Sequence, residues 1–302
     1  MNEFINFLKI VNIDFEENVD AKKLCSFRVG GNIRVVVRPK TADELEWLYS
    51  YLKENKIKNI LLGRGSNVVI SDGGYDGVVV SLSALSSVDL DVTDEHRIVA
   101  GAGLSMANLA LFAHENGLSG LEFAHGIPGS VGGGVYMNAG AYGGEFCKVL
   151  KSCLIFDKER VMLFLVDAEE CDFSYRHSIF MENDNLIVLF ATFELNDGNP
   201  DEIKAKMDEY KAKRLASQPL EYPSAGSTFK RPEGHFAGKL IEDAGLKGYT
   251  IGGAQVSEKH AGFVINRGSA TAEDIKSVIS HIQKTVKEKF DVSLECEVEF
   301  VE

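Results

Sequence analysis

The amino-acid sequence predicts a mixed helix-and-strand protein of about two domains. Three observations indicate this class. The chain has 302 residues, a length that usually corresponds to about two domains. Helix and strand signals alternate along its first half, and the composition shifts near Asn199-Pro200, where a charged helical segment begins. Hydrophobic residues make up 45% of the chain and charged residues 25%, which is ordinary for a soluble globular protein and argues against disorder.

The first half of the chain contains well-marked helix and strand boundaries. Residues 41–44, Thr-Ala-Asp-Glu, form a capping box and open an amphipathic run that predicts a helix. Residues 59–70 predict a short strand, a tight glycine turn and a second apolar strand. Residues 105–116 predict a helix that Gly117 ends.

Strands rich in Val, Leu and Phe are predicted over residues 149–195. The longest apolar runs, at 161–166 and 186–190, suit buried strands. They are far shorter than the roughly 18 apolar residues that a transmembrane helix requires. We therefore expect no membrane-spanning segment.

The C-terminal part carries two helix signals and one strand signal. Residues 201–216 predict a single charged helix, and we place a domain boundary just before it. A second capping box at 271–274 opens a long helix whose apolar residues follow helical spacing. Residues 294–300 predict a terminal strand, because apolar residues alternate there with glutamates.

Charge and cysteine content narrow the possible partners. The formal net charge is −13, which repels nucleic-acid phosphates and anionic lipids, so we expect neither as a partner. Residues 1–20 are acidic and have no feature of a signal peptide. The five cysteines are odd in number and form no CxxC pair, so they support neither a disulfide framework nor a metal site. Reduced thiols in the cytoplasm are the expected state.

Glycine-rich turns are the most unusual feature of the sequence. Such turns let backbone N–H groups converge on phosphate, because no Cβ blocks the approach. They occur at 63–67, 101–103 and 126–134, and residues 28–31 add a fourth turn with a cation. None matches the GxGxxG pattern of a Rossmann site. For each of these segments, the alternative is that the glycines only form ordinary turns and bulges. Residues 126–144, however, hold eight glycines in nineteen positions, and so long a loop is uncommon without a function.

Three polar residues outside these turns are candidates for chemistry. Arg176 could clamp a carboxylate with its bidentate guanidinium, and a plain surface charge is the alternative. Ser227 lies among small residues that let a ligand approach, although the segment is no nucleophile elbow and a turn serine is the alternative. Glu297 lies on the polar face of the terminal strand. That face is either a solvated edge or the wall of a cleft, where crowded carboxylates favour keeping one protonated.

Taken together and in this order, these segments resemble the MurB family, the UDP-N-acetylenolpyruvoylglucosamine reductases. The matching pieces are SFRVGGN, LLGRGSN, GIPGSVGGGVYMNAGAYGGE, YRHS, PSAGSTFKRP, KHAGFVIN and LECEVEF, and they span residues 26–300. The resemblance implies an α+β fold of the vanillyl-alcohol-oxidase and p-cresol-methylhydroxylase type. Two FAD-binding subdomains would occupy residues 1–85 and 86–198, and a C-terminal α+β substrate-binding domain would occupy 199–302.

The resemblance also implies the reaction, which is the NADPH-dependent, FAD-mediated reduction of UDP-N-acetylglucosamine enolpyruvate to UDP-N-acetylmuramate for peptidoglycan. Arg176 and Glu297 fall on the positions that stabilise developing charge, and Ser227 falls on that of the proton donor. Tyr175, Lys230 and His260 fall beside the substrate. Residues expected at the non-covalently bound FAD are Arg28, Gly63, Gly65, Ser66, Asn67, Gly126, Gly129, Ser130, Gly132 and Gly133. No obligatory protein partner is implied.

The chain departs from the family's pattern in three places. Cys25 and Ser26 stand where the family often has two threonines, and Cys296 stands where it often has proline. The stretch between Arg176 and Ser227 is too short for the tyrosine-bearing loop of one subclass, so the chain resembles the loop-lacking type II subclass. Two alternatives stay open: a related flavoenzyme that passes electrons to oxygen, and a nucleotide-binding regulator without turnover. A yellow colour on purification would count against the regulator.

Overall fold

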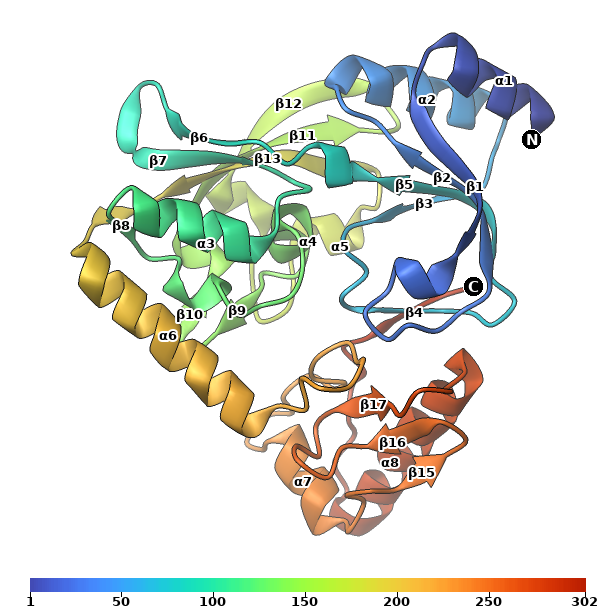
Figure 1. Ribbon diagram of the computed structural model, residues 1–302, viewed down its shortest axis with the longest axis vertical. Coiled ribbons are helices and arrows are strands. Elements are labelled where there is room, and N and C mark those ends of the chain that lie inside the picture. Colours follow the sequence, from blue (N-terminus) through green and yellow to red (C-terminus); the bar gives the residue numbers. More distant parts are fainter. The chain divides into compact units, whose positions relative to one another are not determined.

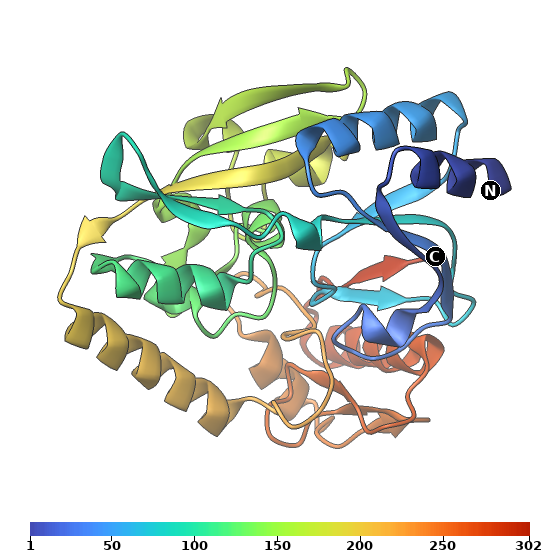
Figure 2. The same ribbon diagram turned by 45° about the horizontal axis from the view of Figure 1, so that its top comes forward.

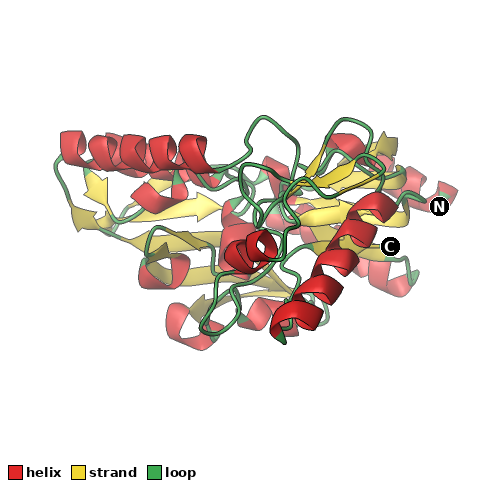
Figure 3. Ribbon diagram, turned by 90° about the horizontal axis from the view of Figure 1, so that it is seen from below, coloured by secondary structure: helices red, strands yellow, loops and turns green.

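The computed structural model describes residues 1–302 and divides into two units. Unit 1 comprises residues 1–16, 36–64 and 77–212, and unit 2 comprises 17–35, 65–76 and 213–302. Each unit is therefore built from chain segments that are distant in sequence. Helices and strands are mixed throughout the chain (Figure 3). The finer division at residues 85 and 198 stays a prediction.

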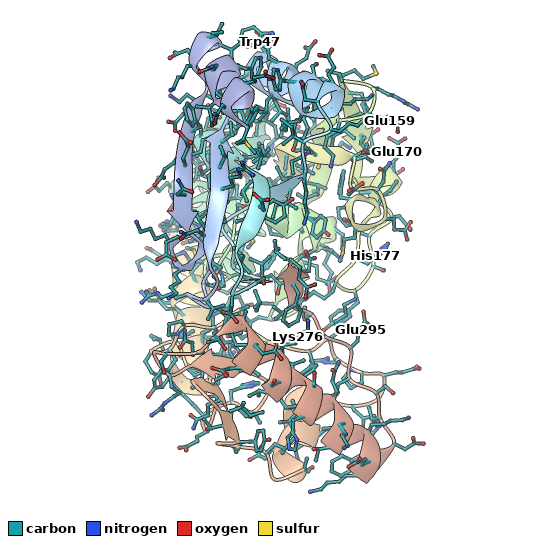
Figure 4. All side chains as sticks on the ribbon, turned by 90° about the vertical axis from the view of Figure 1, so that its right-hand side faces the viewer. Trp47, Glu159, Glu170, His177, Lys276 and Glu295 are labelled. Atoms are coloured by element: carbon teal, nitrogen blue, oxygen red, sulfur yellow. The ribbon has the colours of Figure 1, made fainter.

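The N-terminal region forms two helices and a four-stranded sheet. The helices are α1 (Asn2–Ile10) and α2 (Ala42–Glu54), and the strands are β1 (Asp14–Asp20), β2 (Asn32–Arg38), β3 (Asn59–Leu62) and β5 (Tyr75–Ser81). The strand order is β1-β2-β5-β3, with β3 and β5 parallel. The predicted start of α2 is confirmed, because the Thr41 hydroxyl accepts the Glu44 amide at 3.1 Å. Trp47 projects from the outer face of α2 (Figure 4).

A five-stranded antiparallel sheet is the centre of unit 1. Its strands are β6 (Val88–Asp91), β7 (Asp94–Gly101), β11 (Leu150–Asp157), β12 (Met162–Asp167) and β13 (Leu186–Glu194). Figure 2 shows them side by side, in the order β12-β11-β13-β7-β6. The predicted strands are confirmed, and β13 is buried in the middle. The prediction that residues 161–166 are buried is wrong, because β12 is an edge strand with Met162, Leu163 and Leu165 exposed.

Two helices cover one face of this sheet: α3 (Met106–Glu115) and α4 (Val131–Tyr136) (Figure 1). Helix α3 begins and ends as predicted, with the Ser105 hydroxyl capping its start and Gly117 in the left-handed region at φ 67°. The glycine-rich segment is not one long loop as expected. It contains α4 and the short pair β9 (Gly140–Ala141) and β10 (Gly144–Glu145). The glycines of α4 fit because they lie against buried side chains, such as Phe146 beside Gly134.

The rest of unit 1 consists of short elements and one long helix. The short elements are β8 (Leu118–Ser119), its partner β14 (Asn196–Asp197), and α5 (Ile179–Glu182). The charged helix predicted over 201–216 is confirmed as α6 (Pro200–Ser217). Tyr210 of α6 stacks on Tyr142, with ring centroids 4.4 Å apart, so α6 contacts the glycine-rich segment within unit 1.

Unit 2 contains a small antiparallel sheet covered by the longest helix. Its elements are β4 (Val68–Ile70), α7 (Ala237–Asp243), β15 (Thr250–Ile251), β16 (Ala254–Val256), β17 (Val264–Asn266), α8 (Ala272–Phe290) and β18 (Glu299–Val301). Helix α8 packs on the sheet β15-β16-β17. The predicted capping box of α8 is confirmed, with Thr271 and Asp274 each accepting the other's amide at 3.0 Å. Strand β18 pairs in parallel with β4.

The prediction of one terminal strand over 294–300 is wrong in its extent, because only residues 299–301 form a strand. The preceding residues bond elsewhere. Glu297 N donates to Thr228 O and Lys230 N donates to Glu295 O, both at 2.9 Å, around an isolated bridge between Phe229 and Cys296. The alternation of apolar residues with glutamates predicted an extended backbone, but it did not predict which segment pairs with it. None of the helices combines the length and the apolar character that crossing a lipid bilayer demands.

Candidate functional site

The turn after β3 presents free backbone donors in unit 2. The amides of Gly65, Ser66 and Asn67 donate no hydrogen bond within the chain. Gly65 has φ 61°, and a Cβ there would collide with the carbonyl of Leu24, so only glycine fits. Successive N–H groups at a left-handed residue form a concavity that binds anions. Residues 65–67 therefore fit the phosphate of a dinucleotide.

At several glycine positions of unit 1, the backbone lies very close to other residues of the chain. A Cβ on Gly63 would lie 2.7 Å from Ser130 Oγ, so the start of the turn after β3 lies directly against the glycine-rich segment. A Cβ on Gly132 would lie 2.9 Å from the Cβ of Ala102, and Gly129 has φ 146°. Ser130 is buried, and its hydroxyl accepts the Gly133 amide at 3.4 Å. Gly63 and Gly132 are therefore constrained by space, whereas Gly129 is constrained by its backbone conformation.

Two other expected FAD positions have weaker structural support. Arg28 is exposed in unit 2, at φ 56°, in the turn that precedes β2. Gly126 is half-buried in unit 1, before the segment that leads to α4. Neither position has a close contact that requires this particular residue. Their role stays a prediction.

Arg176 lies in a tight turn of unit 1. Ser174 and His177 exchange both backbone hydrogen bonds at 3.2 Å, which makes Tyr175 and Arg176 the two central residues. Arg176 has φ 56°, a conformation that glycine or asparagine usually adopts. Placing a residue other than glycine there costs about 1–3 kcal/mol, and such residues concentrate at functional sites. This strain is a signal that the sequence did not show.

The guanidinium of Arg176 is held close to the turn. Its Nη2 donates to the carbonyl of Gly140 at 3.1 Å, and its Cζ lies 5.1 Å from the ring centroid of Tyr175. Arg176 is half-buried, whereas Tyr175 is 48% exposed. The charge is therefore oriented before any ligand arrives, and Tyr175 offers an open aromatic surface beside it.

The segments that carry Ser227 and Glu297 pair with one another in unit 2. The bonds of Thr228 to Glu297 and of Lys230 to Glu295 hold residues 227–230 against residues 295–297. Ser227 is exposed and Glu297 is half-buried. Two of the predicted catalytic residues, which are 70 positions apart in the chain, are therefore brought into neighbouring backbone segments.

Asn67 joins the turn of residues 65–67 to Glu297. Its Nδ2 donates to the Glu297 carbonyl at 2.8 Å, and its own carbonyl accepts the Glu299 amide at 3.0 Å. The backbone of Glu297 is thus fixed on one side by Thr228 and on the other by Asn67. The turn expected to hold the cofactor and the expected catalytic glutamate form one connected structure.

Lys230 and His260 belong to the same unit. Lys230 Nζ forms an ion pair with Glu295. His260 Nδ1 accepts the Gly262 amide at 3.1 Å, and burial is the main cause that lowers the pKa of His260, which favours the neutral ring. The Gly262 carbonyl accepts the Thr228 amide at 2.9 Å, so the His260 segment contacts the Ser227 segment.

The predicted residues thus fall into two groups. Unit 2 carries Ser227, Glu297, Lys230 and His260 with the turn 65–67, and unit 1 carries Arg176 and Tyr175 with the glycine-rich segment. The convergence of Arg176 with Ser227 and Glu297 stays a prediction. Sequence reasoning missed Thr228 and Asn138, two buried residues that fix the candidate segments. Their only signal was their place beside Ser227 and within the glycine-rich segment.

Comparisons with known proteins point to one family. A family model described as "UDP-N-acetylenolpyruvoylglucosamine reductase, C-terminal domain" matches residues 218–301, and one described as "FAD binding domain" matches residues 33–158. The chain is 48% identical to the UDP-N-acetylenolpyruvoylglucosamine reductase of Clostridium novyi, over 95% of this chain and 92% of that protein. It is 50% identical to the protein of the same name from Caldanaerobacter subterraneus, over 94% and 92% respectively.

A solved structure gives the same indication. The crystal structure of UDP-N-acetylenolpyruvylglucosamine reductase (MurB) from Thermus caldophilus superposes with a TM-score of 0.81 at 31% identity. The similarity covers 96% of this chain and 99% of that one. Together these matches confirm the expected α+β fold with its FAD-binding region.

Proposed function

Because the chain belongs to the UDP-N-acetylenolpyruvoylglucosamine reductase family, we propose that the residues described above perform the reaction of that family. The chain is an FAD-dependent oxidoreductase that uses NADPH to reduce UDP-N-acetylglucosamine enolpyruvate to UDP-N-acetylmuramate in peptidoglycan biosynthesis. The observation that carries this function is the 48% identity over 95% of the chain. When bound, FAD supplies the two-electron redox chemistry that links NADPH to the enolpyruvyl double bond.

The turn of residues 65–67 and the glycine-rich segment hold the cofactor in this proposal. The amides of Gly65, Ser66 and Asn67 would donate to the diphosphate, which their lack of internal acceptors supports. The close approach of Gly63 to Ser130 leaves no room for a Cβ at that position. The free amides favour a ligand that carries phosphate.

Arg176, and Glu297 as a protonated acid that donates a hydrogen bond, would stabilise the negative charge that develops on the substrate. Reduction at C3 of the enolpyruvyl group places charge at C2 and spreads it into the carboxylate. A guanidinium binds a carboxylate with two parallel hydrogen bonds. It stabilises developing charge most strongly when it is oriented before the reaction begins. The strained turn and the bond from Arg176 to Gly140 support such orientation.

Ser227 would deliver the proton to C2. A serine hydroxyl is a weak acid, so the role requires a fixed position and polar neighbours. The pairing of its segment with residues 295–297 supports a fixed position, and its exposure leaves it accessible to a ligand. Tyr175, Lys230 and His260 would line the substrate.

We place the chain in the loop-lacking type II subclass. Residues 177–226 contain α5, β13, β14 and α6, which leaves no long loop for the tyrosine-bearing element. We also propose a cytoplasmic location without nucleic acid, membrane or an obligatory protein partner. The net charge of −13 supports the exclusion of polyanionic partners.

The two half-reactions separate this function from its alternatives. We expect the purified protein to be yellow and to be reduced by NADPH under anaerobic conditions. Added UDP-N-acetylglucosamine enolpyruvate should then reoxidise the flavin rapidly. Reoxidation by oxygen alone would favour an oxidase, and a colourless protein without turnover would favour a regulator.

Substitution of Ser227 by alanine tests the proton donor. We expect reduction by NADPH to be nearly intact and reoxidation by the enolpyruvyl substrate to slow about 10²-fold, the usual scale for a positioned proton donor. Ser277→Ala is the control, at a half-buried position of α8 that is outside the candidate site. Equal slowing of both half-reactions would show that Ser227 does not act as the acid.

A further inference from the structure

Asn138 is a buried amide with both ends of its side chain bonded. It lies between α4 and β9 and is 1% exposed. Its Nδ2 donates to the carbonyl of Ser174 at 2.9 Å, and its Oδ1 accepts the amide of Cys147 at 3.0 Å. Burying an amide costs free energy unless it is bonded, so a site that bonds both ends also specifies the residue.

The carbonyl that Asn138 binds belongs to the turn that carries Arg176. Ser174 is the first residue of that turn, and His177, labelled in Figure 4, is the last. Two further bonds join the same parts of the chain. Arg176 Nη2 donates to Gly140 O at 3.1 Å, and the buried Ser178 hydroxyl donates to Tyr136 O at 2.6 Å. Residues 136–140 therefore hold the turn at its start, at its strained centre and just after its end.

We propose that Asn138 is a positioning residue for Arg176. Its carboxamide fixes the Ser174 carbonyl and so stabilises the turn in which Arg176 adopts φ 56°. A strained conformation persists only where the surroundings over-determine it, and Asn138 supplies the one buried side-chain donor to the backbone of that turn. The inference rests on the catalytic role proposed for Arg176, because positioning matters only if the guanidinium acts.

Asparagine suits this position for two reasons. Residue 138 itself has φ 45°, which asparagine tolerates better than most residues. One end of the side chain must donate and the other must accept. Aspartate keeps the acceptor for Cys147 but turns an oxygen towards the Ser174 carbonyl, and glycine keeps the backbone conformation while removing both bonds.

Two variants and one control test the structural part. In Asn138→Gly and in Asn138→Asp we expect the amides of Ser174 and His177 to exchange with solvent about tenfold faster, the effect of losing roughly one hydrogen bond's stabilisation. The control is Asn116→Asp, since Asn116 also donates its Nδ2 to a backbone carbonyl, that of Phe112, but on an exposed helix end. Unchanged exchange at Ser174 and His177 in both Asn138 variants would overturn the inference. If Asn138→Gly does not fold, Asn138→Asp decides alone.

A double-mutant cycle tests the functional part. Asn138→Gly should slow reoxidation by the enolpyruvyl substrate roughly 10- to 100-fold, the scale of a small misplacement, and leave reduction by NADPH unchanged. In the Arg176→Ala background the same substitution should slow reoxidation no further, because the group that it positions is gone. If the fold-changes that the two substitutions cause in the reoxidation rate multiplied, Asn138 would have a general structural role. That result would overturn the inference. If Arg176→Ala alone left reoxidation unchanged, the proposed role of Arg176 would fail, whereas the exchange rates would still report whether Asn138 holds the turn.

Discussion

Arg176 carries its charge on a backbone conformation that arginine rarely adopts. Alanine at position 176 has the same Cβ and therefore bears the same backbone cost at φ 56°, so Arg176→Ala isolates the guanidinium. We expect turnover to fall about 10²- to 10³-fold through lost charge stabilisation. The free energy of unfolding should fall by only about 1 kcal/mol, for the lost bond to Gly140.

Two measurements check this prediction: the steady-state rate at saturating NADPH, and the unfolding curve in urea. Arg160→Ala is a matched control in the same unit, because its side chain is 71% exposed and has a surface ion pair with Asp157. An unchanged rate in Arg176→Ala would remove Arg176 from the candidate site. A large loss of stability would instead make the residue primarily structural.

The lowered pKa of His260 predicts that the free energy of unfolding depends on pH. Burial lowers its pKa in the folded protein below the ordinary value of 6.5, so the unfolded chain takes up the proton first as the pH falls. The folded state therefore loses stability as the pH decreases through about 6.5 towards the lower folded pKa, and regains it above. In His260→Gln we expect a shallower decrease in the free energy of unfolding between about pH 7 and pH 5. Identical slopes in the two proteins would refute the prediction.

At the level of elements, the start of α8 shows how local and distant caps combine. The capping box of Thr271 and Asp274 is local, and Asp274 also accepts the Gly253 amide. Hydrogen bonds from the backbone of Thr271 and Gly253 lower the pKa of Asp274. Asp72 is distant in sequence, yet its carboxylate accepts the amides of Ala272 and Glu273 at 2.9 and 3.1 Å. These contacts satisfy amides that a helix start leaves without partners.

Removal of the distant cap should destabilise unit 2. We expect Asp72→Ala to lower the free energy of unfolding by about 1–2 kcal/mol, the upper range for a helix cap, and Asp72→Asn to lower it less. The urea midpoint measures both. Asp76→Ala is the control, because Asp76 is 83% exposed in a surface ion pair with Arg34 and should change stability by less than about 1 kcal/mol. Equal effects of Asp72→Ala and Asp76→Ala would contradict the capping role.

At the level of the whole molecule, unit 2 cannot be cut from the chain as one piece. Residues 213–302 supply α8 and β18, whereas β4 and Asp72 come from residues 65–76. Strand β18 pairs only with β4, so a C-terminal fragment lacks that partner and one helix cap. The continuity of the C-terminal family match over residues 218–301 therefore does not imply an independently folding piece.

We expect a fragment of residues 213–302 to show no cooperative thermal unfolding, since it loses non-local partners that its core requires. Circular dichroism at increasing temperature, compared with the intact chain, measures this. A sharp transition of the fragment near that of the intact protein would show that residues 65–76 are dispensable for its stability.

The sequence by itself determined the features that depend on near neighbours. The starts of α2, α3 and α8 and the length of α6 follow from contacts within a few residues, where capping and spacing decide the outcome. The order of the motifs was enough to indicate the family. Tertiary structure alone decided that β12 is an exposed edge, that residues 295–297 pair with 228–230, and that Asn138 and Asp72 bind distant backbone groups. The physical reason is that these contacts join residues far apart in the chain, and their free energy appears only when the chain is folded.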